Sequence, residues 1–240
     1  MKILSKNNTR QSGRAIDELR QVSIKAGIIK NADGSAIIEF GKNKIIAAVF
    51  GPKEVHPKHM MRNDKAIIKC RYHMMPFSTD TRKNPSLSRR EIEISKVIRE
   101  AIEPAIIMED YPRTAIEVYI EILQSDGGSR CAAINAASVA LADAGINMRD
   151  LITACAAGKA DGKIILDVDD VEDKTGEADM PISILPNLGT ITLFQLDGCL
   201  SEEEFNQALD LATNGCKKLY ELQKNALMNK YFNNNGNKEV

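Results

Sequence analysis

The sequence has no tryptophan, and aromatic residues make up only 5% of its 240 residues. It still has 43% hydrophobic and 27% charged residues, a balance that excludes a disordered or collagen-like chain and allows a sizeable core. No apolar run approaches the ~18 residues of a membrane-spanning helix, and residues 1–14 lack the apolar core of a signal peptide. We therefore expect a cytoplasmic protein with no membrane partner.

Regularly spaced cysteines are also missing. The five cysteines form no CxxC pair and are odd in number, which argues against a disulfide framework and favours reduced thiols. Two short pairs, His56-x-x-His59 and Cys70-x-x-His73, resemble zinc-ligand spacing. However, alternation along a strand predicted over residues 66–74 would place Cys70 and His73 on opposite faces, so we do not expect zinc.

An excess of one charge is lacking too, because 32 Lys and Arg balance 33 Asp and Glu; this excludes a strongly basic nucleic-acid coat protein. The charges are nevertheless segregated. Residues 53–90 hold ten Lys or Arg and three acids, a local net charge of +7, whereas residues 167–204 hold eleven acids and one lysine. The basic region suits a phosphate backbone and the acidic region a divalent cation, although the charge counts alone favour two solvated faces of opposite sign.

Hydrophobic patterning predicts a mixture of strands and helices, and hence an α+β fold in a single domain. The echo between Asp33-Gly34 and Asp161-Gly162 hints at two related halves. We expect an N-terminal arm over residues 1–20 and a frayed tail over 233–240. Strands are predicted at residues 24–29, 36–40, 45–50, 66–74 and 115–123, a hairpin at 181–196, and helices at 88–103, 131–144 and 201–227.

The pair Arg89-Arg90 stands in the first turn of a predicted helix, where the helix dipole penalises positive charge by ~0.3–1 kcal/mol. Two guanidiniums beside exposed helix N–H groups form a good receptor for phosphate oxygens. The alternative is a surface salt bridge with Glu91 and Glu93.

A second candidate is the turn that leads from a strand into the helix at residue 131. Gly127 and Gly128 permit close backbone approach, Ser129 offers a hydroxyl and an N-cap, and Arg130 adds charge. The turn is neither a Walker loop nor a Rossmann fingerprint. It predicts either an anion site or a plain capped turn.

The third candidate is an acidic segment that holds Glu172, Asp173, Glu177 and Asp179. Clustered carboxylates can supply a general acid and a metal ligand, although the spacing is not that of an EF-hand. An acidic surface loop is the alternative.

Taken together, these segments resemble the RNase PH family, and within it most closely the catalytic subunits of the archaeal exosome. Ser12 stands where the family usually has Asp, and Gly128 where it often has Ala. The motifs that carry the resemblance are Arg10-x-Ser-Gly-Arg14, Tyr72-His-Met-Met-Pro-Phe-Ser78, Ser88-Arg-Arg-Glu91, Gly128-Ser-Arg130 and Gly176-Glu-Ala-Asp-Met-Pro181.

The resemblance implies an RNase PH-like fold, also called ribosomal protein S5 domain 2-like, with two related βαβ-type halves whose helices pack on mixed sheets. It implies 3′→5′ phosphorolysis: inorganic phosphate attacks the terminal phosphodiester of single-stranded RNA and releases a nucleoside diphosphate, a reaction that can run backwards. Asp173 would be the general acid and would hold Mg²⁺ with Asp179. Gly128, Ser129 and Arg130 would bind phosphate. RNA would contact Arg89, Arg90, Lys58, Arg62, Lys65, Arg71 and Tyr72, although Tyr72 also suits a core position.

The resemblance further implies an assembly. The expected partners are an inactive RNase PH-like subunit in a trimer of heterodimers and RNA-binding cap subunits. Three alternatives remain at this point: a non-catalytic RNA-binding ring subunit, a homohexameric RNase PH that trims tRNA, and a small-molecule phosphate enzyme.

Overall fold

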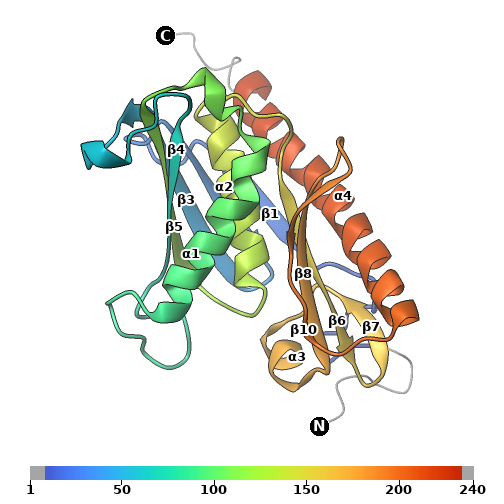
Figure 1. The fold of residues 1–240 in the computed structure, drawn as a ribbon. Coiled ribbons are helices and arrows are strands. Elements are labelled where there is room, and N and C mark those ends of the chain that lie inside the picture. Colours follow the sequence, from blue (N-terminus) through green and yellow to red (C-terminus); the bar gives the residue numbers. More distant parts are fainter. Residues whose placement is uncertain (1–8, 234–240) are drawn as a thin grey trace.

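A buried helix, α2 (Ser129–Asp143), lies between two β-sheets in the structure, a computed structural model that describes residues 9–233 (Figure 1). Its alanine-rich sequence buries nearly every side chain, because small residues let strands approach the helix from both sides. At Gly34 the approach leaves no room for a side chain: a Cβ there would lie 2.3 Å from the carbonyl oxygen of Ala140. The helix therefore joins the two sheets in one continuous core.

The first sheet is mixed and has the strand order β1-β2-β3-β5-β4. The first three strands form the predicted antiparallel meander, and β4 pairs in parallel with β5 after a crossover through α1. The elements of this half are β1 (Val22–Ala26), β2 (Gly34–Phe40), β3 (Asn43–Glu54), β4 (Ile67–Met74), α1 (Arg89–Ile102) and β5 (Thr114–Gln124), with short 3₁₀ turns at Lys58–Met60, Glu103–Ala105 and Met108–Asp110.

The second sheet has the order β10-β8-β6-β7, with β9 also paired to β8. All its ladders are antiparallel, so the expectation of mixed sheets is right for the first half and wrong for the second. The elements of this half are β6 (Thr153–Ala160), β7 (Lys163–Leu166), α3 (Asp170–Thr175), β8 (Ala178–Leu185), β9 (Thr190–Phe194), β10 (Asp197–Gly198) and α4 (Glu202–Asn233).

The helix starts follow local sequence signals. Ser88 and Glu91 form the predicted capping box of α1, and Ser201 with Glu204 does the same at α4. The two Asp-Gly steps differ: Asp161 and Gly162 both have positive φ in a tight hairpin, whereas neither Asp33 nor Gly34 does. The echo between them is therefore not an equivalent turn.

The N-terminal arm packs on the second half of the chain. Arg10, Arg14 and Arg20 are all buried, so the arginines of the described part of the arm are part of the packed fold. Residues 1–8 of the arm and all but Asn233 of the predicted tail lie outside the described residues. Across residues 9–233, no helix is long and apolar enough to cross a membrane.

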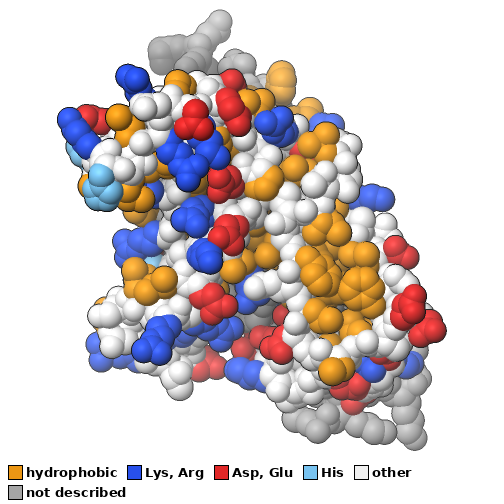
Figure 2. Space-filling view, viewed as in Figure 1, with side chains coloured by type: hydrophobic (Ala, Val, Ile, Leu, Met, Phe, Trp, Pro, Cys, Tyr) orange, Lys and Arg blue, Asp and Glu red, His pale blue; other side chains and the backbone are white. Residues whose placement is uncertain are grey.

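The surface carries a patch of exposed hydrophobic side chains on the second half. Figure 2 shows it on the face where β9 and the following turn lie in Figure 1. Its members are between 41% and 54% exposed: Leu188, Ile191, Phe194 and Leu196.

Candidate active site

A cleft of about 670 Å³ opens where the first turns of α1 and α2 face the acidic segment of the second half. The first half contributes Arg90, Ser129 and Arg130 to its walls. The second half contributes Asp173 and Asp179. Residues that the sequence places in three distant segments are thus brought to one cavity.

The wall at α2 begins with two glycines in left-handed conformation, Gly127 (φ 69°) and Gly128 (φ 63°). Gly128 is the N-cap, and because it has no side chain the first turn of α2 has no side-chain cap. The prediction that Ser129 is the N-cap is therefore wrong; Ser129 is the first helical residue. An uncapped, positive helix end with a hydroxyl and a guanidinium in its first turn is well suited to bind an anion.

Tyr72 supports this wall of the cleft through a hydrogen bond to Ser129. Its hydroxyl lies 2.9 Å from Ser129 Oγ in a hydrogen bond, and its side chain is 0% exposed. Burial raises the pKa of Tyr72, which keeps the phenol neutral. In the described chain Tyr72 therefore takes the core position that the sequence also allowed, and its hydroxyl supports Ser129 at the wall of the cleft.

Arg130 reaches across the cleft. Its Nη1 donates to Gln195 Oε1, which follows β9, and its Nε is buried without a hydrogen-bond partner among residues 9–233. A buried guanidinium N–H without a partner is costly, and phosphate oxygens are acceptors of the right geometry.

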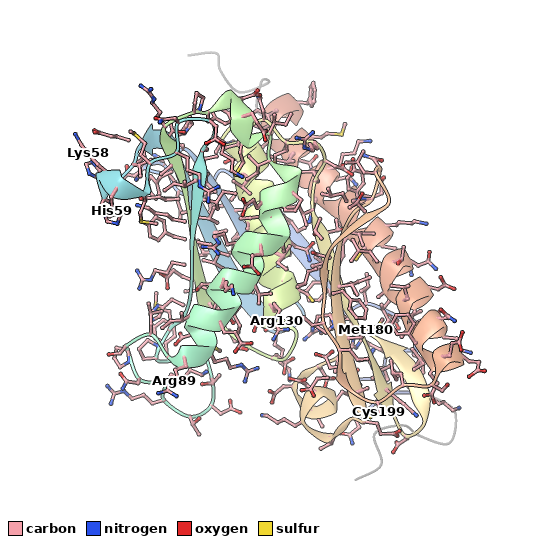
Figure 3. All side chains as sticks on the ribbon, in the orientation of Figure 1. Lys58, His59, Arg89, Arg130, Met180 and Cys199 are labelled. Atoms are coloured by element: carbon pink, nitrogen blue, oxygen red, sulfur yellow. The ribbon has the colours of Figure 1, made fainter. Side chains whose placement is uncertain are left out.

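The paired arginines of α1 divide in position. Arg90 lines the cleft. Arg89 is the first residue of the helix, and its side chain is exposed and lies outside the cleft lining (Figure 3). Neither forms an ion pair with a described residue. The alternative salt bridges with Glu91 and Glu93 are absent from the described part of the chain, since the Glu91 carboxylate accepts the backbone N–H groups of Met74 and Ser88.

The four clustered carboxylates separate in space. Glu172 is 3% exposed and turns inward to Arg10, while Glu177 lies at the surface beside Lys159. Asp173 and Asp179 alone among the four line the cleft. The sequence missed α3, whose capping box is formed by Asp169 and Glu172 and which carries Asp173 in its second half.

Asp179 has an unusual electrostatic environment. Burial, followed by the charge of Asp173, raises the pKa of Asp179 from 3.8 to about 7. Its Oδ1 is buried and has no hydrogen-bond partner among the described residues. Two carboxylates in a partly enclosed cleft, one with an orphaned oxygen, fit the ligand set of Mg²⁺, which binds through one or two carboxylates and keeps several waters.

The basic stretch expected to contact RNA lies outside this cleft. Lys58 and Lys65 pair with Glu54 and Glu103. Figure 3 shows Lys58 on the projection before β4, at the far end of the first sheet from Arg89. Arg62 and Arg71 are exposed and form no ion pair with another described residue.

The zinc pattern does not assemble. Cys70 is largely buried, which raises the pKa of its thiol to about 12, and His73 is hydrogen bonded to Glu121 and to the carbonyl of Pro85. No cluster of three or more metal-ligating side chains occurs in residues 9–233.

Sequence reasoning did not single out several residues that line the cleft. Their common property is that they come from the loop between β4 and α1 or from the segment that follows β9 and includes the start of β10, neither of which has a recognisable motif. They are Asp80, Lys83, Gln195 and Asp197.

The family comparisons agree with this architecture. The 3′ exoribonuclease family, domain 1, matches residues 18–147, and domain 2 of the same family matches residues 150–215. The chain therefore belongs to the RNase PH family of 3′ exoribonucleases. The match also bears out the RNase PH-like fold expected from the motifs.

Particular relatives are more similar still. The chain is 59% identical over 236 residues to the exosome complex component Rrp41 of Nitrosopumilus maritimus, covering 98% of this chain and 97% of that one. It is 57% identical over 232 residues to the protein of the same name from Pyrococcus furiosus, covering 97% and 93%.

Solved structures give the same fold. Rice Rrp46 superposes with a TM-score of 0.79 at 25% identity, covering 90% of this chain and 98% of that one. A chain of the Archaeoglobus fulgidus exosome with RNA bound to the active site superposes with a TM-score of 0.76 at 24% identity, covering 90% and 93%.

Proposed function

We propose that the chain is a catalytic exosome subunit that degrades single-stranded RNA from its 3′ end with inorganic phosphate and releases nucleoside diphosphates. The observation that carries this function is the cleft itself, where an uncapped helix end with Ser129 and Arg130 faces Asp173 and Asp179. An anion site beside an acid is what phosphorolysis needs, and near full-length similarity to proteins named Rrp41 supports it.

The attacking phosphate binds at the start of α2. Ser129 Oγ and the Arg130 guanidinium hold its oxygens, and Gly128 leaves the backbone open to it. Arg90 and Arg89 neutralise the RNA phosphates, including the one under attack. Positioning and charge neutralisation supply most of the rate in phosphoryl transfer.

The departing 3′ oxygen needs a proton, and we assign the role of general acid to Asp173, which lines the cleft. Burial, followed by the charge of Asp173, raises the pKa of Asp179 to about 7, so a proton is retained in the cleft close to neutrality. Mg²⁺, when held by Asp173 and Asp179, would supply charge neutralisation at the transferring phosphoryl group. The attacking group is phosphate and not water, so the reaction is a phosphorolysis and not a hydrolysis.

The assembly follows from the same proposal. The chain alternates with an inactive RNase PH-like subunit in a trimer of heterodimers in the cytoplasm, and cap subunits feed RNA past Lys58, Arg62, Lys65 and Arg71. The exposed patch around Phe194 supports a permanent partner, since apolar side chains gathered on one surface mark interaction sites.

The test uses end-labelled single-stranded RNA and Mg²⁺, with and without inorganic phosphate, and the chain alone or with its RNase PH-like partner. We expect nucleoside diphosphates only when phosphate is present. Release of monophosphates without phosphate would contradict phosphorolysis. The absence of any release with the partner present would favour a non-catalytic ring subunit.

A further inference from the structure

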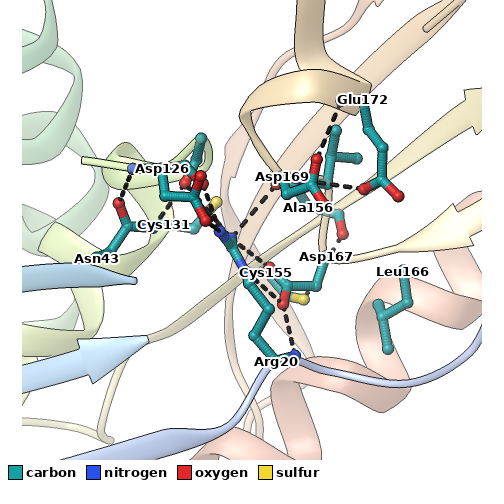
Figure 4. A network of polar contacts seen from close by, with 12 residues as sticks. Arg20, Asn43, Asp126, Cys131, Cys155, Ala156, Leu166, Asp167, Asp169 and Glu172 are labelled. Carbon is teal, nitrogen blue, oxygen red and sulfur yellow. Dashed lines mark hydrogen bonds and ion pairs between the residues drawn. The ribbon is translucent and has the colours of Figure 1, made fainter. Parts of the chain in front are cut away.

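The Arg20 guanidinium lies between two parts of the active site that come from different halves of the chain. We call residues 126–130 the phosphate loop and residues 167–179 the acidic segment. The Arg20 side chain is 6% exposed, and Figure 4 shows it in the middle of a polar network. Its Nε and Nη2 donate to the two carboxylate oxygens of Asp167, at 2.9 and 2.7 Å.

The same guanidinium also binds the phosphate loop. Its Nη1 donates to the carbonyl oxygen of Asp126 at 2.5 Å, and Nη2 donates to that of Val168 at 3.3 Å. One planar group therefore holds backbone oxygens of both segments at once. A lysine ammonium, which is a single point of charge, cannot reproduce this fork.

Asp167 binds Arg20 through both the side chain and the main chain of the arginine. It also accepts the backbone N–H of Arg20 at 2.8 Å, so one carboxylate fixes both the main chain and the side chain of that residue. Its backbone has φ 57°, an uncommon conformation for a residue other than glycine. Strain of this kind persists only where surrounding contacts enforce it.

The two segments also touch through their backbones. A Cβ at Gly127 would lie 2.4 Å from the backbone nitrogen of Asp170, so the phosphate loop packs directly on the first residue of α3. On the other side, Asn43 donates to the carbonyl of Gly127 at 2.7 Å and accepts the N–H of Asp126 at 2.6 Å. The loop is thus held between the first sheet and α3, with Asp173 one turn further along that helix.

We propose that Arg20 is a positioning residue. Held by its hydrogen bonds to Asp167, it sets the distance between the phosphate bound at Ser129 and Arg130 and the carboxylates of the acidic segment. This role rests on the proposed phosphorolytic function. It matters because the two walls of the cleft belong to different sheets, and a misplacement of about 1 Å costs about 10²-fold in rate.

Arg14 offers a matched control. Its side chain is 10% exposed, and it donates to Asp167 at 3.2 Å and to Asp169 at 3.4 Å. It makes no hydrogen bond to the phosphate loop. Arg14→Lys therefore disturbs a buried ion pair with the same carboxylate and leaves the link to Asp126 in place.

The experiment compares the wild-type full-length chain, Arg20→Lys and Arg14→Lys in the assembly in which the wild type turns over RNA. Thermal unfolding and RNA binding report structural damage, while kcat and the KM for inorganic phosphate report positioning. We expect both variants to unfold at lower temperature and to bind RNA. Only Arg20→Lys should lose about 10- to 100-fold in kcat and raise the phosphate KM several-fold.

Equal kinetic effects of the two variants, in an active wild-type background, would overturn the positioning role and leave the proposed function standing. A wild-type chain that releases no nucleoside diphosphate would overturn the proposed function itself, and the positioning role with it. If Arg20→Lys does not fold, Asp167→Asn is tested in its place, because this variant removes one of the two oxygen acceptors that bind the Arg20 guanidinium. Unchanged kcat and phosphate KM in that variant would also overturn the role.

Discussion

Two clusters of charged side chains lie close together in this molecule and differ in whether their charges are paired. The first, which we call the arm cluster, joins Arg10, Arg14 and Arg20 to Asp167 and Glu172. Its five side chains are at most 10% exposed, and each one is paired. Removing such charges from water is tolerated only because every one of them has a partner.

The cleft is built from the same kinds of residue but leaves some of their polar atoms without a partner. Arg130 Nε and Asp179 Oδ1 are buried without partners among residues 9–233, and Arg90 forms no ion pair there. Native proteins rarely leave buried polar atoms unpaired, so these exceptions mark the place where a ligand completes the network. Charge clustering in the sequence does not distinguish the two regions, whereas pairing in the structure does.

The largest effect should come from removing the acid of the cleft. Asp173→Asn should lower kcat for phosphorolysis by about 10²- to 10⁴-fold, because the 3′ oxygen then departs without its proton donor. The melting temperature and RNA affinity should stay close to wild type, since Asp173 is exposed. Glu177→Gln, on the same segment but outside the cleft, is the control; equal losses in both variants would show that general electrostatics and not acid catalysis is at work.

The next effect should come from the arm cluster and should appear in stability. Arg10→Met removes the closer of the two arginines that pair with the buried Glu172 carboxylate and leaves only Arg14, at 3.8 Å, which should cost about 3–5 kcal/mol of unfolding free energy in a urea titration. Lys174→Met removes an exposed pair with Asp170 and should leave the unfolding midpoint unchanged. A small effect of Arg10→Met would mean that the cluster is less enclosed than its contacts indicate.

The pH dependence of stability should distinguish the cleft from the arm cluster through Asp179, whose pKa is raised. In the fold the pKa of Asp179 is about 7, above its ordinary value of 3.8, so the folded state binds this proton more tightly than the unfolded state. The contribution of Asp179 is therefore fully present below about pH 4 and is lost as the pH rises through about 7. In EDTA, the unfolding free energy of wild type minus that of Asp179→Asn should fall over this window; a flat difference would contradict the raised pKa.

The smallest effect should come from the support beneath the phosphate site. Tyr72→Phe removes the hydrogen bond to Ser129 and should raise the phosphate KM a few-fold, with a loss of about 1 kcal/mol in stability. Tyr119→Phe is matched, since it also loses one hydroxyl hydrogen bond, to Glu117, but lies outside the cleft. Its phosphate KM should remain that of the wild type. Equal KM values in both variants would remove Tyr72 from the support of the site.

Much of the fold could be predicted where the signal is local. The capping boxes at Ser88 and Ser201 place two helix starts, and Gly145 follows α2 with a positive φ of 72°, as is common for a glycine after a helix. The β1-β2-β3 meander follows from short apolar runs and the turns between them. In the second half the hairpin predicted at residues 181–196 is present as β8 and β9, whereas the order of the sheet and the short helix α3 were missed, because strand order and a six-residue helix depend on neighbours distant in sequence.

The candidate site was predicted in composition but not in arrangement. Asp173, Asp179, Ser129 and Arg130 carry recognisable motifs, and all four line one cleft. The same reasoning left Tyr72 open between an RNA contact and a core position, and it left the arm arginines without a role. Both gaps have one cause: burial is decided by what packs on a residue, and no local pattern reports that.

By itself, then, the sequence determined the strand meander of the first half and the capped helix starts, since each depends on neighbours within a few positions, and it supplied the residue types that phosphorolysis requires. Only the tertiary structure decided which charges are paired and which are left for a ligand. Glu172 and Asp173 are adjacent in sequence, yet one is buried against Arg10 and the other faces the cleft. The physical reason is that successive residues of a helix project about 100° apart, so the packing of α3 sends neighbouring carboxylates into different environments.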